Sequence, residues 1–295
     1  MAASLKKLLI GTSVAVGMSA VASLPAKAAS FDFNNSETNY ATYTHNSNNL
    51  WIQGNEAAAI SALTDGNLQT NVELNYTNET NSSSVGFTAT AGNYTAKVSS
   101  VTTTEFNAFQ GEWLNGLLNT YQPLKNVWNS SSVFLQNAAL TAFKSSVGFG
   151  DPNIAEFSLD STGAMSMKTL GFLDLKPRVN YLIDTAVNQL NPMAKAFLAP
   201  QVNSFKAALG QIDQLQISEI TKVELNGVSE YVYSFNAENS GFVALDDVAG
   251  KSYSGVYSWS KAGTPAAVPE PSTILGLMAV GGLFGAAKRN ANKKA

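Results

Sequence analysis

Two apolar segments, one at each end of the chain, limit which part of the sequence can fold as a globular domain. A pair of lysines precedes a largely apolar stretch of fifteen residues, 8–22, and a second apolar stretch of fourteen residues, 274–287, precedes a basic tail. Apolar segments flanked by cations are typical of sequences that direct a chain to a membrane. We therefore expect the globular fold to lie within residues 29–262.

The N-terminal segment has the features of a secretory signal peptide in their usual order. Its lysines form a positive region, the apolar stretch follows, and a proline then interrupts that stretch. Ala26 and Ala28 provide the small-x-small pattern that signal peptidase cleaves. We expect residues 1–28 to be a signal peptide, cut after Ala28 or the next residue, rather than an uncleaved anchor or a buried first helix.

The C-terminal apolar stretch is too short and too rich in glycine for a good core helix. The sixteen residues that start at Ser272 contain four glycines, each of which costs up to about 1 kcal/mol relative to alanine in a helix. Their helix would reach about 24 Å, compared with about 30 Å for the hydrocarbon core. Lys288 and Arg289 favour a cytoplasmic end. We expect a transmembrane sorting segment over 272–295, after a linker over 263–271.

A proline-rich motif stands directly before this segment, and its prolines hold the backbone extended for a processing enzyme. The order of motif, glycine-rich apolar segment and basic end, from Val268 to Arg289, resembles the PEP-CTERM sorting signal of Gram-negative bacteria. The resemblance implies recognition by exosortase, a membrane-embedded, cysteine-dependent transpeptidase-like enzyme, and cleavage near the motif, with release or attachment at the cell surface. The motif residues are Pro269, Glu270, Pro271 and Ser272.

Charge and composition narrow the function classes open to the body. Seven of the 18 basic residues but only one of the 21 acidic residues lie in the two ends, which leaves 11 basic and 20 acidic residues and a net charge near −9 for the body. A body with this charge repels nucleic-acid phosphates, so we expect no nucleic-acid partner. The chain has no cysteine, which excludes disulfides, thiolate metal sites and cysteine nucleophiles.

Hydrophobic periodicity predicts an α+β body in which antiparallel β-strands flank a central helical segment. Residues 31–53 are expected to be extended, and 55–65 to form a short helix. Asn226-Gly227 predicts a hairpin with a type I′ turn. The remaining predicted strands are a meander over 72–76, 85–89 and 94–98, and two strands over 242–245 and 253–259; the predicted helices cover 106–121, 133–143, 177–190 and 193–209, the last broken near Pro200.

No residue pattern identifies a catalytic site, a cofactor site or a metal site. His45 is the only histidine and no G-x-S-x-G sequence occurs, which disfavours a serine triad and a zinc site. Turn chemistry explains Asp246-Asp247 and Asp151-Pro-Asn better than calcium binding does. A two-carboxylate hydrolase remains an alternative, because folding can bring together acidic residues that are far apart in the sequence. Its candidates are Glu105, Glu112, Asp151, Glu156 and Asp160.

Aromatic residues are the remaining candidates for ligand contact. Alternating aromatic residues on strands more often pack a core than stack on sugars. They are Trp113, Trp128, Tyr231, Tyr233, Tyr257 and Trp259.

These patterns together favour an exported, non-catalytic structural or adhesive protein at the cell surface or in the extracellular matrix. Signal peptidase and exosortase would be its processing partners, the inner membrane a transient one, and envelope polysaccharide its ligand. The alternatives are a secreted carbohydrate-binding module or polysaccharide hydrolase, and a plain single-pass membrane protein.

Overall fold

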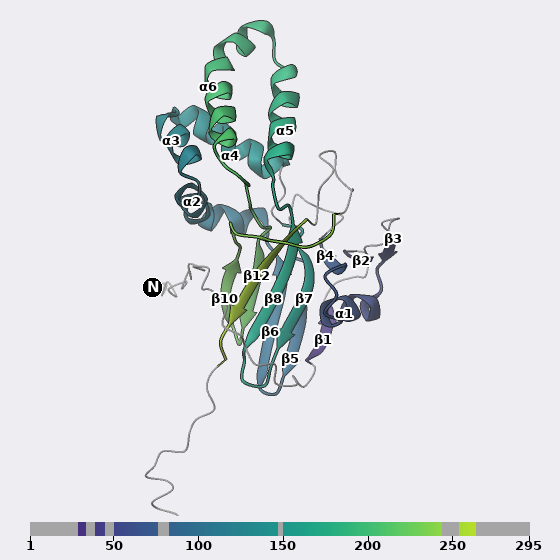
Figure 1. The fold of residues 1–295 in the computed structure, drawn as a ribbon. Helices are drawn as coiled ribbons and strands as arrows, with labels where there is room; N and C mark the ends of the chain where they lie inside the picture. The colour runs from purple at the N-terminus through teal and green to yellow at the C-terminus, as the bar shows by residue number, and fades with distance from the viewer. Residues whose placement is uncertain are drawn as a thin grey trace, which may run out of the picture. The chain divides into compact units, whose positions relative to one another are not determined.

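The computed structural model describes residues 29–33, 39–44, 50–75, 83–146, 150–243 and 254–263 (Figure 1). These residues form two antiparallel sheets and six helices, so the α+β prediction is confirmed. No helix in these ranges is long and apolar enough to cross a membrane. The predicted signal peptide and the sorting segment lie outside the described residues.

Sheet A has five strands in the order β1-β5-β6-β9-β10. Its last hairpin joins β9 to β10 through Asn226 and Gly227, whose φ angles of 48° and 84° are those of the predicted type I′ turn. The strands are β1 (Ser30–Phe33), β5 (Gly86–Ala91), β6 (Tyr94–Ser100), β9 (Thr221–Leu225) and β10 (Val228–Val232).

Sheet B has seven strands in the order β11-β12-β8-β7-β4-β2-β3. The predicted meander is wrong at its first connection, because β4 belongs to this sheet whereas β5 and β6 belong to sheet A. The predicted strand at 242–245 is also wrong where it is described, since Phe242 and Val243 follow a two-residue strand, β11. The strands are β2 (Tyr40–Thr44), β3 (Leu50–Gln53), β4 (Thr70–Leu74), β7 (Asn153–Leu159), β8 (Met165–Gly171), β11 (Glu238–Asn239) and β12 (Gly255–Lys261).

The main core lies between the two sheets. Phe87 of sheet A and Phe157 of sheet B meet edge to face with ring centroids 5.4 Å apart, an arrangement that aromatic pairs prefer. Helix α1 (Glu56–Thr64) extends this core over β2, β4 and β7. Its Glu56 accepts a hydrogen bond from the Phe33 backbone N–H on edge strand β1. The bounds of α1 confirm the predicted helix at 55–65. Through the bond to Phe33, this helix connects sheet B to the edge of sheet A.

The five helices after α1 occur in two insertions rather than in one central segment, so that part of the prediction is wrong. Helices α2 (Thr103–Thr120), α3 (Gln122–Ser130) and α4 (Val133–Ser146) separate β6 from β7, whereas α5 (Lys176–Asn188) and α6 (Pro192–Gly210) separate β8 from β9. The hairpin of β7 and β8 lies between the insertions and near the centre of sheet B. A bulge between Ile154 and Glu156 interrupts its alternation of apolar and polar residues, which weakens the strand pattern in the sequence.

Helix α2 carries the predicted apolar face. Thr102 and Glu105 form a capping box at its start, and Phe106, Phe109 and Trp113 are buried against the segment that follows β10.

The helices of the second insertion are less buried, and α5 has no buried residue. Helix α6 continues through Pro200 without the predicted break. A proline in a helix interior costs about 3 kcal/mol, because it lacks an N–H and its ring clashes with the preceding turn. The packing of Phe205 and Leu209 in the core of the helical end offsets this cost.

Both helical insertions leave the same end of the sheets. The register places Ser100, which precedes α2, beside Thr221, which follows α6. The first strand begins at the opposite end, where Ser30 pairs with Thr90, and β12 also finishes there, where Lys261 pairs with Met165 (Figure 1). We call these the helical end and the turn end of the body. Both terminal segments of the chain are therefore attached to the body at its turn end.

Candidate functional site

The outer face of sheet A carries a polar row that crosses all five strands. Because side chains alternate along a strand, the register aligns Asp32, Thr88, Lys97, Glu224 and Ser229 across this face. The Lys97 Nζ atom lies 3.5 Å from Glu224 Oε1, and the Ser229 hydroxyl donates to Glu224 Oε2 over 3.2 Å. The side chain of Lys97 is 61% exposed, so its ammonium remains accessible to a ligand.

A second row on the same face runs through Gly86, Ser99, Lys222 and Tyr231. Lys222 Nζ lies 2.8 Å from Oε1 of Glu105, which reaches this row from the first turn of α2. Burial is the largest single influence and favours the neutral forms of both groups, but their mutual hydrogen bond and their attraction, together with the other contacts of each group, outweigh it. The pKa of Glu105 is therefore lowered, also by its bonds from Thr102, and the pKa of Lys222 is raised. Both groups stay charged near neutral pH.

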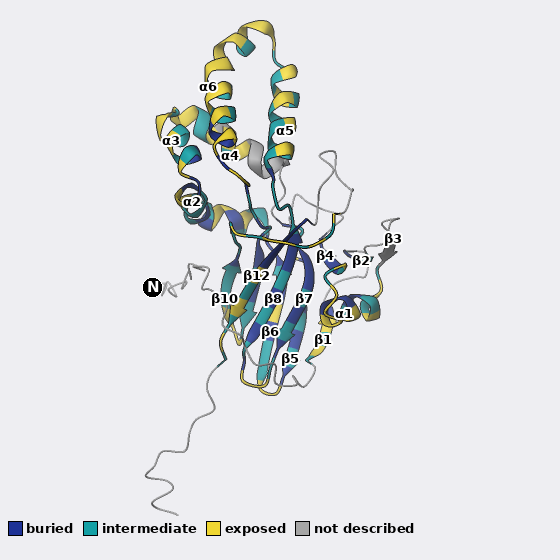
Figure 2. Ribbon diagram, viewed as in Figure 1, coloured by how far each residue is buried: buried dark blue, intermediate teal, exposed yellow. Residues whose placement is uncertain are grey.

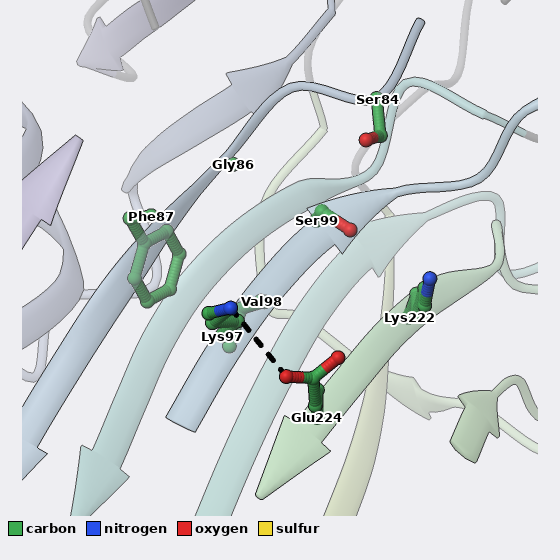
Figure 3. A pocket seen from close by; sticks show the side chains of 8 residues that line it. All are labelled: Ser84, Gly86, Phe87, Lys97, Val98, Ser99, Lys222 and Glu224. Carbon is green, nitrogen blue, oxygen red and sulfur yellow. Dashed lines mark ion pairs between the residues drawn. The ribbon is translucent and has the colours of Figure 1, made fainter. Parts of the chain in front are cut away.

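An open depression of about 280 Å³ lies between these rows (Figure 3). The serine hydroxyls, the lysine ammonium groups and the glutamate offer hydrogen-bond donors and acceptors, as a hydroxyl-rich ligand requires. Gly86 brings two backbones close together here, since a Cβ atom on it would lie 2.0 Å from the Val98 carbonyl oxygen. The lining residues are Ser84, Gly86, Phe87, Lys97, Val98, Ser99, Lys222 and Glu224.

The sequence patterns do not identify this depression, although the predicted strand over 94–98 indicates the face on which Lys97 lies. The predicted alternation of Tyr94, Ala96 and Val98 implies that the residues between them, Lys97 included, face the other way. The sequence does not show that β6 and β9 are neighbours, because both helical insertions and the β7–β8 hairpin separate these strands along the chain.

Only the pairing of β6 with β9 brings Lys97 and Lys222 to one face. Periodicity within one strand gives the face on which a side chain lies, but it does not give the neighbouring strand. The site on sheet A therefore depends on long-range pairing that local patterns do not encode.

The structure places most of the aromatic candidates in packing roles. Trp113 and Tyr257 are buried, which confirms the packing prediction for both. The Tyr231 ring stacks on Phe109 with centroids 4.1 Å apart, and burial raises the pKa of Tyr233 to about 12. Trp128 and Trp259 are partly buried against core clusters.

The candidate carboxylates lie on different elements and have different local partners. Glu156 of β7 pairs with Lys168 of β8 over 2.6 Å on the outer face of sheet B. Asp160 accepts hydrogen bonds within the turn between these strands, chiefly from Thr162, and its pKa is lowered. Glu112 lies on α2, and Asp151 precedes β7. Across the residues that the structure describes, no three acidic or histidine side chains form a group that could hold a metal.

Several residues singled out in the sequence lie outside the described ranges. They include His45, Asp246, Asp247, the cleavage-site residues Ala26 and Ala28, the sorting-motif residues Pro269, Glu270, Pro271 and Ser272, and the basic flank Lys288 and Arg289.

Comparison with known proteins identifies the C-terminal region. Residues 267–290 match the PEP-CTERM protein-sorting motif, which confirms the resemblance drawn from the sequence. The chain therefore carries a sorting signal of the class that exosortase processes, and this signal implies export with membrane anchoring during sorting. No curated protein matches the chain. No solved structure matches it either.

Proposed function

We propose that the protein is an exported, non-catalytic surface module that binds envelope polysaccharide through the depression on sheet A. The observation that carries the proposal is the sorting motif at residues 267–290, which implies export and membrane anchoring during sorting of a body that has an accessible polar face. Lys97, Ser99 and Glu224 would contact sugar hydroxyls by hydrogen bonds. Release from the membrane or attachment to the surface would follow cleavage near the Pro-Glu-Pro sequence.

The Glu105–Lys222 ion pair, whose lysine lines the depression, supports binding rather than hydrolysis. A glycosidase uses one carboxyl group with a raised pKa as its general acid. Glu105 has the opposite pKa shift, because its bonds to Lys222 and Thr102 outweigh the effect of burial. Its partner Lys222 holds it in an ion pair instead of leaving it to donate a proton.

A polysaccharide pulldown with the mature protein tests this proposal. We expect retention on the envelope polysaccharide of the producing cells, and a loss of about fivefold or more in Lys97→Ala, equivalent to about 1 kcal/mol. Lys168→Ala is the matched control, because Lys168 also pairs with a glutamate but lies on sheet B. No retention of the wild type, or equal losses in the two variants, would contradict the proposed site.

A reducing-sugar assay on the same samples tests the absence of catalysis. We expect no release of reducing ends above the level without protein. Reproducible release that is lost in Glu105→Gln or Glu156→Gln would show that the body is a hydrolase.

A further inference from the structure

The distal half of the α5–α6 hairpin exposes apolar side chains. Met193 and Phe197 lie one helical turn apart on α6, and 84% and 72% of their surfaces are exposed. Phe205 and Leu209 continue the same four-residue spacing along this helix, and they pack into the core of the helical end. Figure 2 shows α5 and the start of α6 in exposed and intermediate colours, in contrast to the dark interior of the sheets. Met193 and Phe197 thus form an exposed stripe at the start of an apolar row whose other end, at Phe205 and Leu209, is packed.

The same region is almost free of charge. Lys195 is the only charged residue between Asp184 and Lys206, and these two flanking residues form an ion pair with each other. The rest of the body is strongly acidic, so copies of this protein repel one another over most of their surfaces. A surface depleted of charge and bearing large apolar side chains is typical of the centre of a protein interface.

The end of the body at which the two terminal segments join it bears on which partner Met193 and Phe197 contact. The body begins at Ser30 and finishes its last strand at Lys261, both at the turn end. The hairpin instead follows β8 and precedes β9 at the helical end. The membrane-directed segments therefore join the body at the end that does not carry the hairpin, which disfavours the anchoring membrane as the partner of Met193 and Phe197.

We propose that this stripe is a docking surface for a second copy of the protein. Two hairpins related by a two-fold axis would pack as a four-helix arrangement, with Met193 and Phe197 of each copy against the other. An uncharged apolar stripe is complementary to itself, whereas the acidic remainder of the body is not. The proposal does not depend on polysaccharide binding, because the depression lies on a different element of the fold.

Sedimentation velocity of the mature protein over a range of concentrations tests the docking surface. We expect a concentration-dependent dimer that Phe197→Asp weakens at least about tenfold, because an isologous contact loses the side chain on both copies. Phe134→Asp is the matched control, since Phe134 is 75% exposed at the start of α4, and it should leave the dimer unchanged. A wild-type protein that stays monomeric, or equal effects of the two variants, would overturn the proposal.

Two further measurements separate the possible occupants of the stripe. The chain has no cysteine, so Ala196→Cys places a single thiol beside Phe197, and a bifunctional maleimide should link two copies there but not in Ser258→Cys. A dimer that Ala196→Cys does not link would place the interface elsewhere and overturn the proposal. Co-sedimentation of a monomeric wild type with anionic lipid vesicles, lost in Phe197→Asp, would assign the stripe to a membrane instead.

Discussion

Lys222 of β9 and Glu105 of α2 form an ion pair with 2.8 Å between Nζ and Oε1. The pair joins the first helical insertion to the outer face of sheet A. Glu105 also accepts hydrogen bonds from the backbone N–H and the hydroxyl of Thr102 through its second oxygen. One carboxylate therefore fixes the start of α2 and neutralises a lysine of the depression.

Glu105→Gln should lower the free energy of unfolding by about 1 kcal/mol at pH 7, the scale of a partly exposed ion pair. The amide can still cap α2, because a capping box accepts glutamine, so the variant isolates the ion pair. Glu224→Gln is the control and should cost less, since its partner Lys97 is more exposed and 3.5 Å away. Urea denaturation of both variants and the wild type measures the difference.

The contribution of the Glu105–Lys222 pair should also depend on pH. The lowered pKa of Glu105 gives stability that is present above its ordinary value of 4.5 and is lost as the pH falls through the lowered pKa. The raised pKa of Lys222 gives stability that is present below 10.5 and is lost as the pH rises through the raised pKa. Wild type and Glu105→Gln should therefore differ most between these limits and converge in acid. A constant difference down to about pH 2 would contradict this account.

Gly163→Ala should destabilise the body by about 2–3 kcal/mol. Gly163 has a φ of 81°, and a Cβ atom on it would lie 2.5 Å from the Tyr94 ring, so the variant combines backbone strain with a clash between the two sheets. Gly66→Ala separates the two effects, because Gly66 has a φ of 67° with no atom within 4 Å of the added Cβ. It should cost only about 1 kcal/mol. Equal losses in chemical denaturation would show that the Tyr94 contact is unimportant.

Gly111→Ala should stabilise the protein by about 1 kcal/mol, because alanine favours a helix interior and no atom lies within 4 Å of the added Cβ. For a body of this size the melting temperature should rise by about 2–4 °C. Gly116→Ala on the same helix is the comparison, since its Cβ would lie 2.9 Å from Phe235 Cε2. Calorimetry should show a smaller gain or a loss for Gly116→Ala, and the reverse order would contradict the packing of α2 against Phe235.

Elements with strong local signals were predictable from the sequence. The Asn226-Gly227 turn requires positive φ angles that few other residue pairs adopt, and the apolar positions of α2 recur at helical spacing. The β7–β8 hairpin was missed, because its bulge disturbs the alternation and helices flank it in sequence. The course of α6 through Pro200 depends on tertiary packing at Phe205 and Leu209, which outweighs the local preference of proline.

The candidate site was less predictable than the sorting signal. The motif at Pro269-Glu270-Pro271 is a contiguous pattern, so the sequence alone is sufficient to recognise it. The depression on sheet A instead combines Lys97 with Glu224 and Glu105 with Lys222, and each pair forms only when distant strands and a helix come together. Local periodicity carries no information about such pairs.

Intact-mass measurement of the mature protein from cells that contain exosortase tests the central claim, which is export followed by exosortase processing. We predict a chain that begins at Ala29 or Ser30 and ends near Pro269-Glu270-Pro271, together with an unprocessed C-terminus when these three residues are changed to alanine. A mature chain that keeps residues beyond Pro271 in the unaltered protein would contradict the account and would indicate a plain single-pass membrane protein.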